Sequence, residues 1–290
     1  MARFIGTRHT SRLSRRLVAL IYSPPSREAP YIDETIVAWD GTRYEVDTRS
    51  DCEWDVFVKG GYEISLQRLM ASLVTPGDVV VDCGANVGIH TCFLARRVGP
   101  AGRVISVEPI QALSQRLRRN VELNALDNID VVVKATSSAP GRALMYPPIP
   151  GTSNQGLGSL YYRSGVSSRG VPTELDTLDN IVAAVKADRV NLIKIDVEGS
   201  ELETLLGCAR ILSSFRPPVV FEYSPVTYGA ADISWLQLTE WLCQRNGYTL
   251  FELVEDELRP VAPAALRQAP WRWNVMLLAR PPRATEGLAG

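Results

Sequence analysis

Apolar residues recur along this chain in two different periods. From position 78 onward, short continuous apolar runs alternate with longer segments in which apolar residues return every three or four positions. The continuous runs predict buried strands, and the longer segments predict amphipathic helices. The predicted strands are 79–81, 104–107, 131–133, 192–195, 219–221, 248–253 and 275–278. Such alternation is typical of an α/β protein whose mostly parallel sheet is covered by helices on both faces.

Amphipathic helices are expected between and around these strands. The predicted segments are 64–73, a helix ending at Val98, 110–121, 202–212 as one helix, and 235–246 with Gly247 as its cap. Ligands of parallel sheets bind beyond the carboxyl ends of the strands. Residues at those ends are therefore the first candidates for chemistry.

The first 65 residues differ from the rest. Runs 35–39 and 44–46 flank Asp40-Gly41, a dipeptide typical of hairpin turns, so we expect a small N-terminal β element over residues 31–65. Residues 1–30 are an Arg-rich leader whose apolar stretch is too short for the core of a signal peptide. We favour a solvated leader over a basic amphipathic helix in weak contact with an anionic membrane.

The Rossmann-like domain is expected to cover residues 66–280, followed by a tail at 281–290. Residues 136–172 interrupt the strand–helix alternation and are rich in Gly, Ser and Pro. A loop of this length in a compact domain is usually functional or disordered. Since it follows the third strand, it lies near the ligand edge. We favour a substrate-facing insertion with a short hairpin around residues 160–162 over a plain flexible loop.

Composition narrows the possible partners and the compartment. The net charge is -1, whereas nucleic-acid-binding domains are usually strongly basic. Five cysteines without a Cys-x-x-Cys pair and two histidines give no zinc-ligand spacing. Reduced, buried thiols in a cytoplasmic protein are the expectation. No apolar run approaches the roughly 20 residues that span a bilayer.

The strongest motif is the run Asp82-Cys-Gly84-Ala85-Asn86-Val-Gly88, which follows the first predicted strand. Gly84 allows a tight turn, and Gly88 allows a helix to pack closely against a strand. Asn86 stands where a dinucleotide fingerprint has a glycine facing the pyrophosphate, which argues against NAD or FAD. Asp82, at the end of the strand, suits a cationic amino group such as that of methionine. A tight turn without a ligand is the alternative.

A second motif is Glu108-Pro109, which ends the second predicted strand. A carboxylate at this place accepts hydrogen bonds from both ribose hydroxyls of a nucleoside. Proline then favours the start of the next helix.

The third motif surrounds the fourth predicted strand. Lys194 lies within an apolar strand, where an unpaired charge is costly. Asp196 and Glu198 follow at the carboxyl end, where either can orient or deprotonate a substrate hydroxyl. The alternative is that Glu198 and Glu201 only favour the following helix N-terminus electrostatically, and for Glu201 we prefer that interpretation.

Three further residues stay secondary. Asp176 is interpreted as a helix N-cap rather than a catalytic group. Glu222 follows the fifth apolar run and can face the same cleft. His90 either contacts a ligand or is simply packed, and packing is favoured. Without a carboxylate–histidine constellation, we predict no metal site.

Together these motifs resemble the FkbM family of methyltransferases. Its members carry Asp-x-Gly-Ala-Asn-x-Gly, Glu-Pro, a Leu-Asp pair and Lys-Ile-Asp-x-Glu-Gly-x-Glu. The matching residues here are Asp82, Gly84, Ala85, Asn86, Gly88, Glu108, Pro109, Leu175, Asp176 and Lys194 through Glu201. A Tyr-Glu pair of the family resembles Tyr62-Glu63, and the match runs from residue 60 to about residue 225.

The resemblance implies a Rossmann-like class I methyltransferase with a seven-stranded sheet, its last strand inserted antiparallel. It implies S-adenosyl-L-methionine as cofactor and O-methylation of a hydroxyl, on acceptors such as sugars of glycolipids and oligosaccharides or polyketide macrocycles. Tyr62 and Glu63 are then expected to lie over the cofactor. The cofactor-binding set is Asp82, Gly84, Ala85, Asn86, Gly88, Glu108, Pro109, Tyr62 and Glu63. The catalytic set is Asp196, Glu198 and Lys194.

Rival functions stay open at this point. They are an NAD-dependent oxidoreductase, a methyltransferase for a peptide or nucleic-acid acceptor, and a non-catalytic cofactor-binding protein of the same fold. We expect a small-molecule or glycan acceptor, no nucleic acid and a cytoplasmic location, with a homodimer as one possible assembly.

Overall fold

The computed structural model describes residues 33–149, 158–224, 227, 235–266 and 275–281. The expected leader, and with it the expected membrane contact, lies outside the described residues, as does all but residue 281 of the expected tail. Within the described part, no helix has the length and apolar character needed to cross a bilayer.

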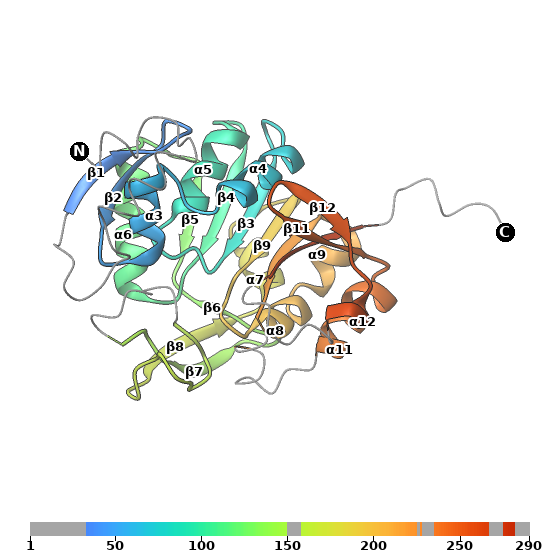
Figure 1. The fold of residues 1–290 in the computed structure, drawn as a ribbon. Coiled ribbons are helices and arrows are strands. Elements are labelled where there is room, and N and C mark those ends of the chain that lie inside the picture. The colour runs from blue at the N-terminus through green and yellow to red at the C-terminus, as the bar shows by residue number, and fades with distance from the viewer. Residues whose placement is uncertain (1–32, 150–157, 225–226, 228–234, 267–274, 282–290) are drawn as a thin grey trace.

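One large sheet organises the chain (Figure 1). Its strand order is β12-β11-β13-β10-β9-β3-β4-β5. The bounds are β3 (Val79–Cys83), β4 (Arg103–Val107), β5 (Ile129–Val132), β9 (Leu192–Ile195), β10 (Val219–Tyr223), β11 (Thr249–Val254), β12 (Glu257–Pro260) and β13 (Val275–Arg280). All seven expected strands are present, and β13 lies antiparallel between β10 and β11, as expected.

The eighth strand, β12, is an addition to the expectation. It forms an antiparallel hairpin with β11 at the edge of the sheet, where most of its side chains are exposed or half-exposed. Its sequence therefore lacks the apolar run by which the other strands are recognised.

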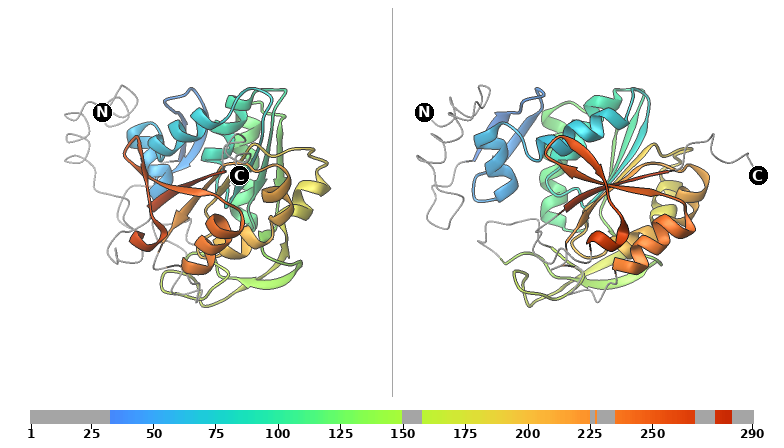
Figure 2. Two further views of the ribbon diagram at one scale, coloured as in Figure 1. Left: turned by 90° about the vertical axis from the view of Figure 1, so that its right-hand side faces the viewer. Right: turned by 45° about the vertical axis from the view of Figure 1, so that its right-hand side comes forward.

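Helices pack on both sides of the sheet (Figure 2). They are α4 (Ile64–Leu73), α5 (Ile89–Val98), α6 (Gln111–Leu123), α7 (Leu178–Ala184), α8 (Glu201–Leu206), α9 (Ala209–Ser214), α11 (Trp235–Thr239), which continues as a π-helical turn (Glu240–Arg245), and α12 (Pro263–Leu266). On one face, α4 and α5 pack against strand residues such as Val80 and Leu192. On the other face, α7, α8 and α9 pack against Val81 and Ile193. Since successive strand residues point to opposite faces, continuous apolar strands supply both layers.

The expected single helix over 202–212 is wrong. The helix is interrupted at Gly207, whose carbonyl accepts a hydrogen bond from the backbone N–H of Asp179 at 3.0 Å. The Asp179 carboxylate then accepts hydrogen bonds from the backbone N–H groups of Arg210 (2.9 Å) and Ile211 (3.0 Å) at the start of α9. The break depends on a distant residue, so the local apolar period does not reveal it.

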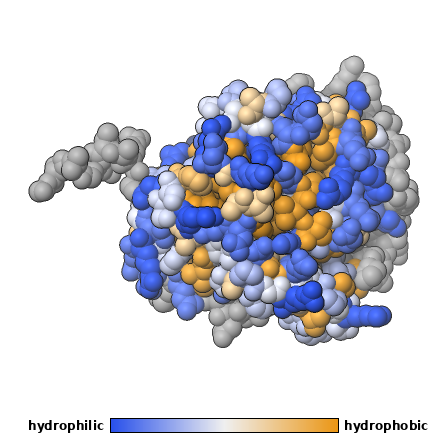
Figure 3. Space-filling view, turned by 180° about the vertical axis from the view of Figure 1, so that it is seen from behind, coloured by the Kyte–Doolittle hydropathy of each residue, from blue (hydrophilic) through white to orange (hydrophobic). Residues whose placement is uncertain are grey.

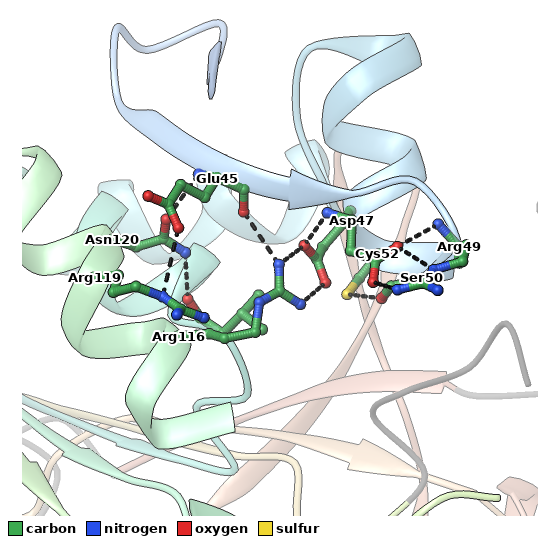
Figure 4. Close-up of polar contacts among 10 residues, drawn as sticks. Glu45, Asp47, Arg49, Ser50, Cys52, Arg116, Arg119 and Asn120 are labelled. Atoms are coloured by element: carbon green, nitrogen blue, oxygen red, sulfur yellow. Dashed lines mark hydrogen bonds and ion pairs between the residues drawn. The ribbon is translucent and has the colours of Figure 1, made fainter. Parts of the chain in front are cut away.

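The N-terminal hairpin is confirmed, as β1 (Asp33–Val37) and β2 (Arg43–Asp47) pair antiparallel. Residues Asp51–Lys59, however, form helix α3, which the loose alternation of this region did not indicate. This element is fastened to α6 by polar contacts (Figure 4). Arg116 donates to the buried carboxylate of Glu53 at 2.7 Å, and the Asn120 side-chain oxygen accepts from the Glu45 backbone N–H at 2.9 Å.

The insertion forms a second sheet from β6 (Ala135–Thr136), β7 (Gly141–Met145) and β8 (Val171–Asp176), ordered β6-β8-β7. In Figure 1 it lies below the carboxyl ends of the main strands. The expected hairpin around 160–162 is wrong, because β7 and β8 are the paired arms. Residues 160–162 are bends and irregular chain that follow an isolated bridge between Tyr146 and Ser159.

The helix cap expected at Asp176 is displaced by one residue. Thr177 is the N-cap of α7, and its hydroxyl accepts a hydrogen bond from the Asn180 backbone N–H at 3.1 Å. Asp176 instead accepts from the Thr177 backbone N–H and pairs with Lys134 at 2.8 Å.

Apolar side chains on the surface concentrate on the insertion. Seen from behind, the molecule has an apolar area near the centre within a largely hydrophilic surface (Figure 3). Among the described residues, the most exposed large apolar side chains include four of the insertion: Leu144, Ile149, Tyr162 and Val171.

Candidate active site

A pocket lies beyond the carboxyl ends of β3, β4, β9 and β10, where ligands of parallel sheets bind. Together with the open solvent at its mouth, its empty space is about 1130 Å³. Its walls are Asp51, Cys52, Tyr62, Gly84, Ala85, Asn86, Val87, Ile89, His90, Val107, Glu108, Pro109, Ile110, Leu113, Lys134, Ala135, Thr136, Met145, Gly158, Leu160, Lys194, Asp196, Val197, Glu198, Ser200 and Glu222. The structure therefore brings together residues from the glycine turn, the Lys194 block, the N-terminal element and the insertion.

The glycine turn touches the loop that follows β9. Gly84 has φ +74°, and a Cβ at this residue would lie 1.7 Å from the Asp196 carbonyl oxygen. The backbone N–H groups of Gly84 and Ala85 donate to the Val107 carbonyl at 2.9 and 3.1 Å. Only glycine fits both the left-handed conformation and this close approach.

Gly88 serves packing rather than the pocket wall. Its φ is +86°, and a Cβ there would lie 2.9 Å from Cγ of Leu117 in α6. The expectation of close packing holds, but the partner is a helix rather than a strand.

Glu108 organises the other side of the turn. Its two carboxylate oxygens accept from the backbone N–H groups of Asn86 (2.9 Å) and Ile110 (2.8 Å). Burial raises the pKa of Glu108 to about 7. Each oxygen keeps a further lone pair that can accept a ligand hydroxyl. Pro109 lies beside it in the pocket wall.

Asp82 and Lys194 lie side by side on adjacent strands, in register. Asp82 is fully buried and lies outside the pocket walls; it accepts from the Thr91 hydroxyl at 2.6 Å and lies 3.4 Å from Lys194 Nζ. Lys194 Nζ is also 3.3 Å from Asp196 Oδ2. Burial alone lowers the pKa of Lys194, but Asp82 and Asp196 outweigh it, so the pKa is raised and the ammonium form is stable.

This arrangement changes the picture of Asp82 as a direct ligand of an amino group. Its carboxylate is engaged by Lys194 and Thr91 beneath the wall. An unpaired charge at Lys194 would be costly in this apolar strand, but Lys194 is paired with the carboxylates of Asp82 and Asp196.

Three carboxylates gather at one end of the pocket. Oxygen atoms of Asp196, Glu198 and Glu222 lie within 4.8 Å of one another. Burial, followed by the charge of Asp196, raises the pKa of Glu198 to about 8 and that of Glu222 well above its ordinary value. Among the described residues this group has the spacing to hold a metal ion, but such acidic groups are common without one.

Glu198 is held by the insertion, which the sequence did not indicate. Its carboxylate receives a hydrogen bond from Arg163 at 2.6 Å, and its backbone carbonyl receives one from the Ser159 hydroxyl at 2.7 Å. Lys134 is a second wall residue that sequence reasoning missed. Only the Gly/Ser-rich composition of the insertion pointed to this region.

Glu201 has a structural role, but it binds the turn before α8 rather than favouring the helix N-terminus by its charge, the role preferred from the sequence. Its carboxylate accepts from the backbone N–H groups of Val197 and Gly199, both at 3.1 Å. It is fully buried, and burial raises its pKa to about 7.

Tyr62 and Glu63 lie next to His90 at the edge of the pocket. The tyrosine lines the pocket, whereas Glu63 contacts His90 from behind, with Oε2 and Nε2 3.0 Å apart. Burial raises the pKa of Tyr62. Burial also tends to raise the pKa of Glu63, but the hydrogen bond and charge of His90 and the charge of Lys194 lower it. His90 is therefore both packed and part of the wall.

The walls suit a polar ligand with several hydrogen-bonding groups. Three buried polar atoms of wall residues have no hydrogen-bond partner within the described part of the chain: Asn86 Oδ1, His90 Nδ1 and Ser200 Oγ. Buried polar atoms are nearly always paired, so these atoms indicate a missing partner. With the free lone pairs of Glu108, they fit the ribose and amino-acid groups of S-adenosylmethionine.

Comparison with known proteins agrees with this geometry. The profile of the family described as Methyltransferase FkbM domain matches residues 82–250. Methyltransferase sdnD of Sordaria araneosa is 29% identical over 154 residues, which cover 44% of this chain and 59% of that protein. The hexuronic acid methyltransferase AglP of Haloferax volcanii is 29% identical over 155 residues, which cover 53% of this chain and 59% of that protein. The chain thus spans about three fifths of these curated relatives.

Solved structures are more distant. A methyltransferase FkbM from Methylobacillus flagellatus KT superposes with a TM-score of 0.46 at 22% identity, covering 71% of this chain and 44% of that one. The family profile, in contrast, spans more than half of this sequence and includes the glycine turn, Glu108 and the Lys194 block. The chain belongs to the FkbM methyltransferase family and carries a methyltransferase domain whose cofactor is S-adenosyl-L-methionine.

Proposed function

We propose that the protein is an O-methyltransferase that acts on a hydroxyl of a sugar, a glycolipid or a polyketide-type natural product. One observation carries the proposal: the glycine turn with Glu108 and the carboxylates Asp196 and Glu198 line one continuous pocket. The cofactor side and a group able to accept a proton therefore face the same space.

The residues divide the work as follows. Gly84, Asn86 and Glu108 hold the nucleoside, and S-adenosylmethionine, when bound, supplies an electrophilic methyl group. Glu198 takes the proton of the acceptor hydroxyl, because its pKa of about 8 lies close to neutral pH, where a general base works best. Lys194 fixes Asp196 beside it. Positioning of the two reactants supplies the larger part of the rate.

The nature of the acceptor rests on the insertion and the relatives. Met145, Gly158 and Leu160 of the insertion line the pocket, and apolar side chains of the same segment are exposed outside it. A surface of this kind suits a hydroxylated molecule with apolar parts. The relatives named above include a hexuronic acid methyltransferase, which supports a sugar.

We also propose a cytoplasmic location and no nucleic-acid partner. All five cysteines are free and four are buried, as is usual in a reducing compartment. The net charge of -1 offers no general attraction for nucleic acid.

The test has two stages. Calorimetric titration with S-adenosylhomocysteine, with NAD as control, is expected to give micromolar binding of the former alone. Transfer of a labelled methyl group is then measured with hexuronic acid glycosides, other oligosaccharides, polyketides, peptides and RNA. Glu198→Gln is expected to keep the affinity for S-adenosylhomocysteine and to lose kcat by roughly 10²–10⁴-fold.

Each alternative has its own signature. Full activity of Glu198→Gln would remove that residue from the mechanism. Labelling of peptide or RNA instead of hydroxylated sugars and polyketides would support the other acceptor class. Cofactor binding without transfer to any acceptor would favour a non-catalytic protein.

A further inference from the structure

The insertion contacts the candidate base, Glu198, through both its side chain and its backbone. Arg163 Nη2 lies 2.6 Å from Glu198 Oε2, and the Ser159 hydroxyl donates to the Glu198 carbonyl at 2.7 Å. The side chains of Arg163 and Glu198 are 9% and 16% exposed. Solvent therefore screens this ion pair less than a surface pair.

The backbone at Glu198 needs such support. Its φ is 55°, a left-handed conformation that non-glycine residues rarely adopt. Ser159 is itself fixed, because its backbone N–H and carbonyl pair with Tyr146 at 3.0 and 2.8 Å. The turn at Glu198 and the insertion thus hold each other in place.

Arg163 differs in charge from most of the groups around Glu198. The groups that face it from packed elements are Asp196 with Lys194 at the end of β9, Glu201 at the start of α8, Glu222 on β10 and Arg163 from the insertion. Three of these are carboxyl groups, and Lys194 is already shared between Asp82 and Asp196. Among these groups, Arg163 is the cation that directly contacts the Glu198 carboxylate.

We infer that Arg163 is a positioning residue that stabilises the carboxylate form of Glu198 and aims it into the pocket. This inference rests on the proposed role of Glu198 as base. The segment expected to contact the acceptor would thereby also control the proton-accepting group, so that a displaced insertion switches off the base. Arg163 itself is assigned no contact with the reacting atoms.

The variant Arg163→Met keeps much of the side-chain volume and removes the charge. Loss of an opposite charge at this distance is expected to raise the pKa of Glu198 by about 1–3 units. The acidic limb of the kcat/KM profile then moves to higher pH, and kcat/KM at pH 7 falls by roughly tenfold or more. Arg163→Lys keeps the charge without the planar fork and is expected to restore most of the profile.

The matched control is Arg169→Met. Arg169 is an exposed residue of the same insertion, and its backbone N–H donates a hydrogen bond to the Ser167 hydroxyl. The acidic limb is expected to stay where it is in the parent protein. An Arg163→Met profile that also stays there would overturn the inference.

Two measurements separate this inference from the proposed function and from misfolding. Carbon-13 NMR titration of glutamate-labelled protein reads the pKa of Glu198 without any acceptor, with Glu198→Gln identifying the signal. If the pKa does not rise in Arg163→Met, the inference fails even when methyl transfer occurs. In a Glu198→Gln background, Arg163→Met is expected to change kcat/KM less than twofold; a further large loss would mean that Arg163 acts only on structure.

Discussion

Gly84→Ala tests whether the glycine turn and the Asp196 loop must touch. In the present structure an alanine Cβ would lie 1.7 Å from the Asp196 carbonyl oxygen. Real Cβ contacts do not fall below 3.0 Å, so the two backbones must move apart by more than an ångström. A backbone oxygen, unlike the end of a flexible side chain, has no other rotamer to adopt.

The magnitude has two parts. The left-handed conformation costs alanine about 1–2 kcal/mol, and forced separation of packed groups costs about 1–3 kcal/mol more. The first part can be measured alone with Gly77→Ala, because Gly77 has φ +93° and nothing within 4 Å of its would-be Cβ. The difference between the two variants in free energy of unfolding is the cost of the close approach.

The functional effect follows from the same displacement. Moving the turn disturbs the hydrogen bond from the Asn86 backbone N–H to Glu108. If S-adenosylhomocysteine binding loses about 1 kcal/mol as a result, its affinity falls about fivefold. A shift of about 1 Å between the cofactor and the loop that carries Asp196 and the proposed base Glu198 lowers turnover roughly 100-fold. Urea unfolding, calorimetry and methyl transfer measure these three quantities. Gly84→Ala that matches Gly77→Ala in all three would refute the reasoning.

Two further predictions concern the support of the site. Arg116→Met leaves the buried Glu53 carboxylate without its main partner and is expected to lower the free energy of unfolding by about 3 kcal/mol. The control Arg119→Met breaks the exposed 3.5 Å pair with Glu45 and is expected to cost less than about 1 kcal/mol. Equal losses of the two variants in urea unfolding would contradict this prediction. Buried carboxyls bind protons more tightly in the folded state, with pKa values of about 7 for Glu108 and Glu201, so melting temperature is expected to fall as pH rises from 5 to 8. The decrease in melting temperature is expected to be smaller in Glu201→Gln and unchanged in the control Glu257→Gln, which alters an exposed residue. A decrease of the same size in the parent protein and both variants would show that Glu201 does not titrate in this range.

Most of the sheet could be predicted from the sequence, because strands that are buried on both faces consist of continuous apolar runs. Strand β12 could not, because most of its side chains are exposed or half-exposed and its sequence lacks an apolar run. Helix α3 was missed although Cys52, Val56 and Phe57 are buried at helical spacing, because it has only nine residues and one of its buried residues is the charged Glu53. The break at Gly207 was hidden for another reason. Its cause is Asp179, which is far away in sequence and caps the second half of the interrupted helix.

The candidate site shows the same division. The ends of β3, β4 and β9 were identified from sequence, because parallel strands deliver their carboxyl ends to one edge. Their detailed pairing was not. That Asp82 would face Lys194 rather than the pocket depends on the register between two strands, and that Arg163 would reach Glu198 depends on how the insertion folds back.

The pairing of charges bears on how a site so rich in carboxyl groups can serve methyl transfer. S-adenosylmethionine carries a positive sulfonium, and excess negative charge around it would stabilise the bound cofactor more than the transition state, in which that charge spreads. The structure limits the excess. Lys194 offsets one of the two charges of Asp82 and Asp196, Arg163 offsets Glu198, and a raised pKa favours the neutral form of Glu222. Because part of the negative charge is compensated, the pocket stabilises the bound methyl donor less in its ground state, which is compatible with the proposed role of Glu198 as base.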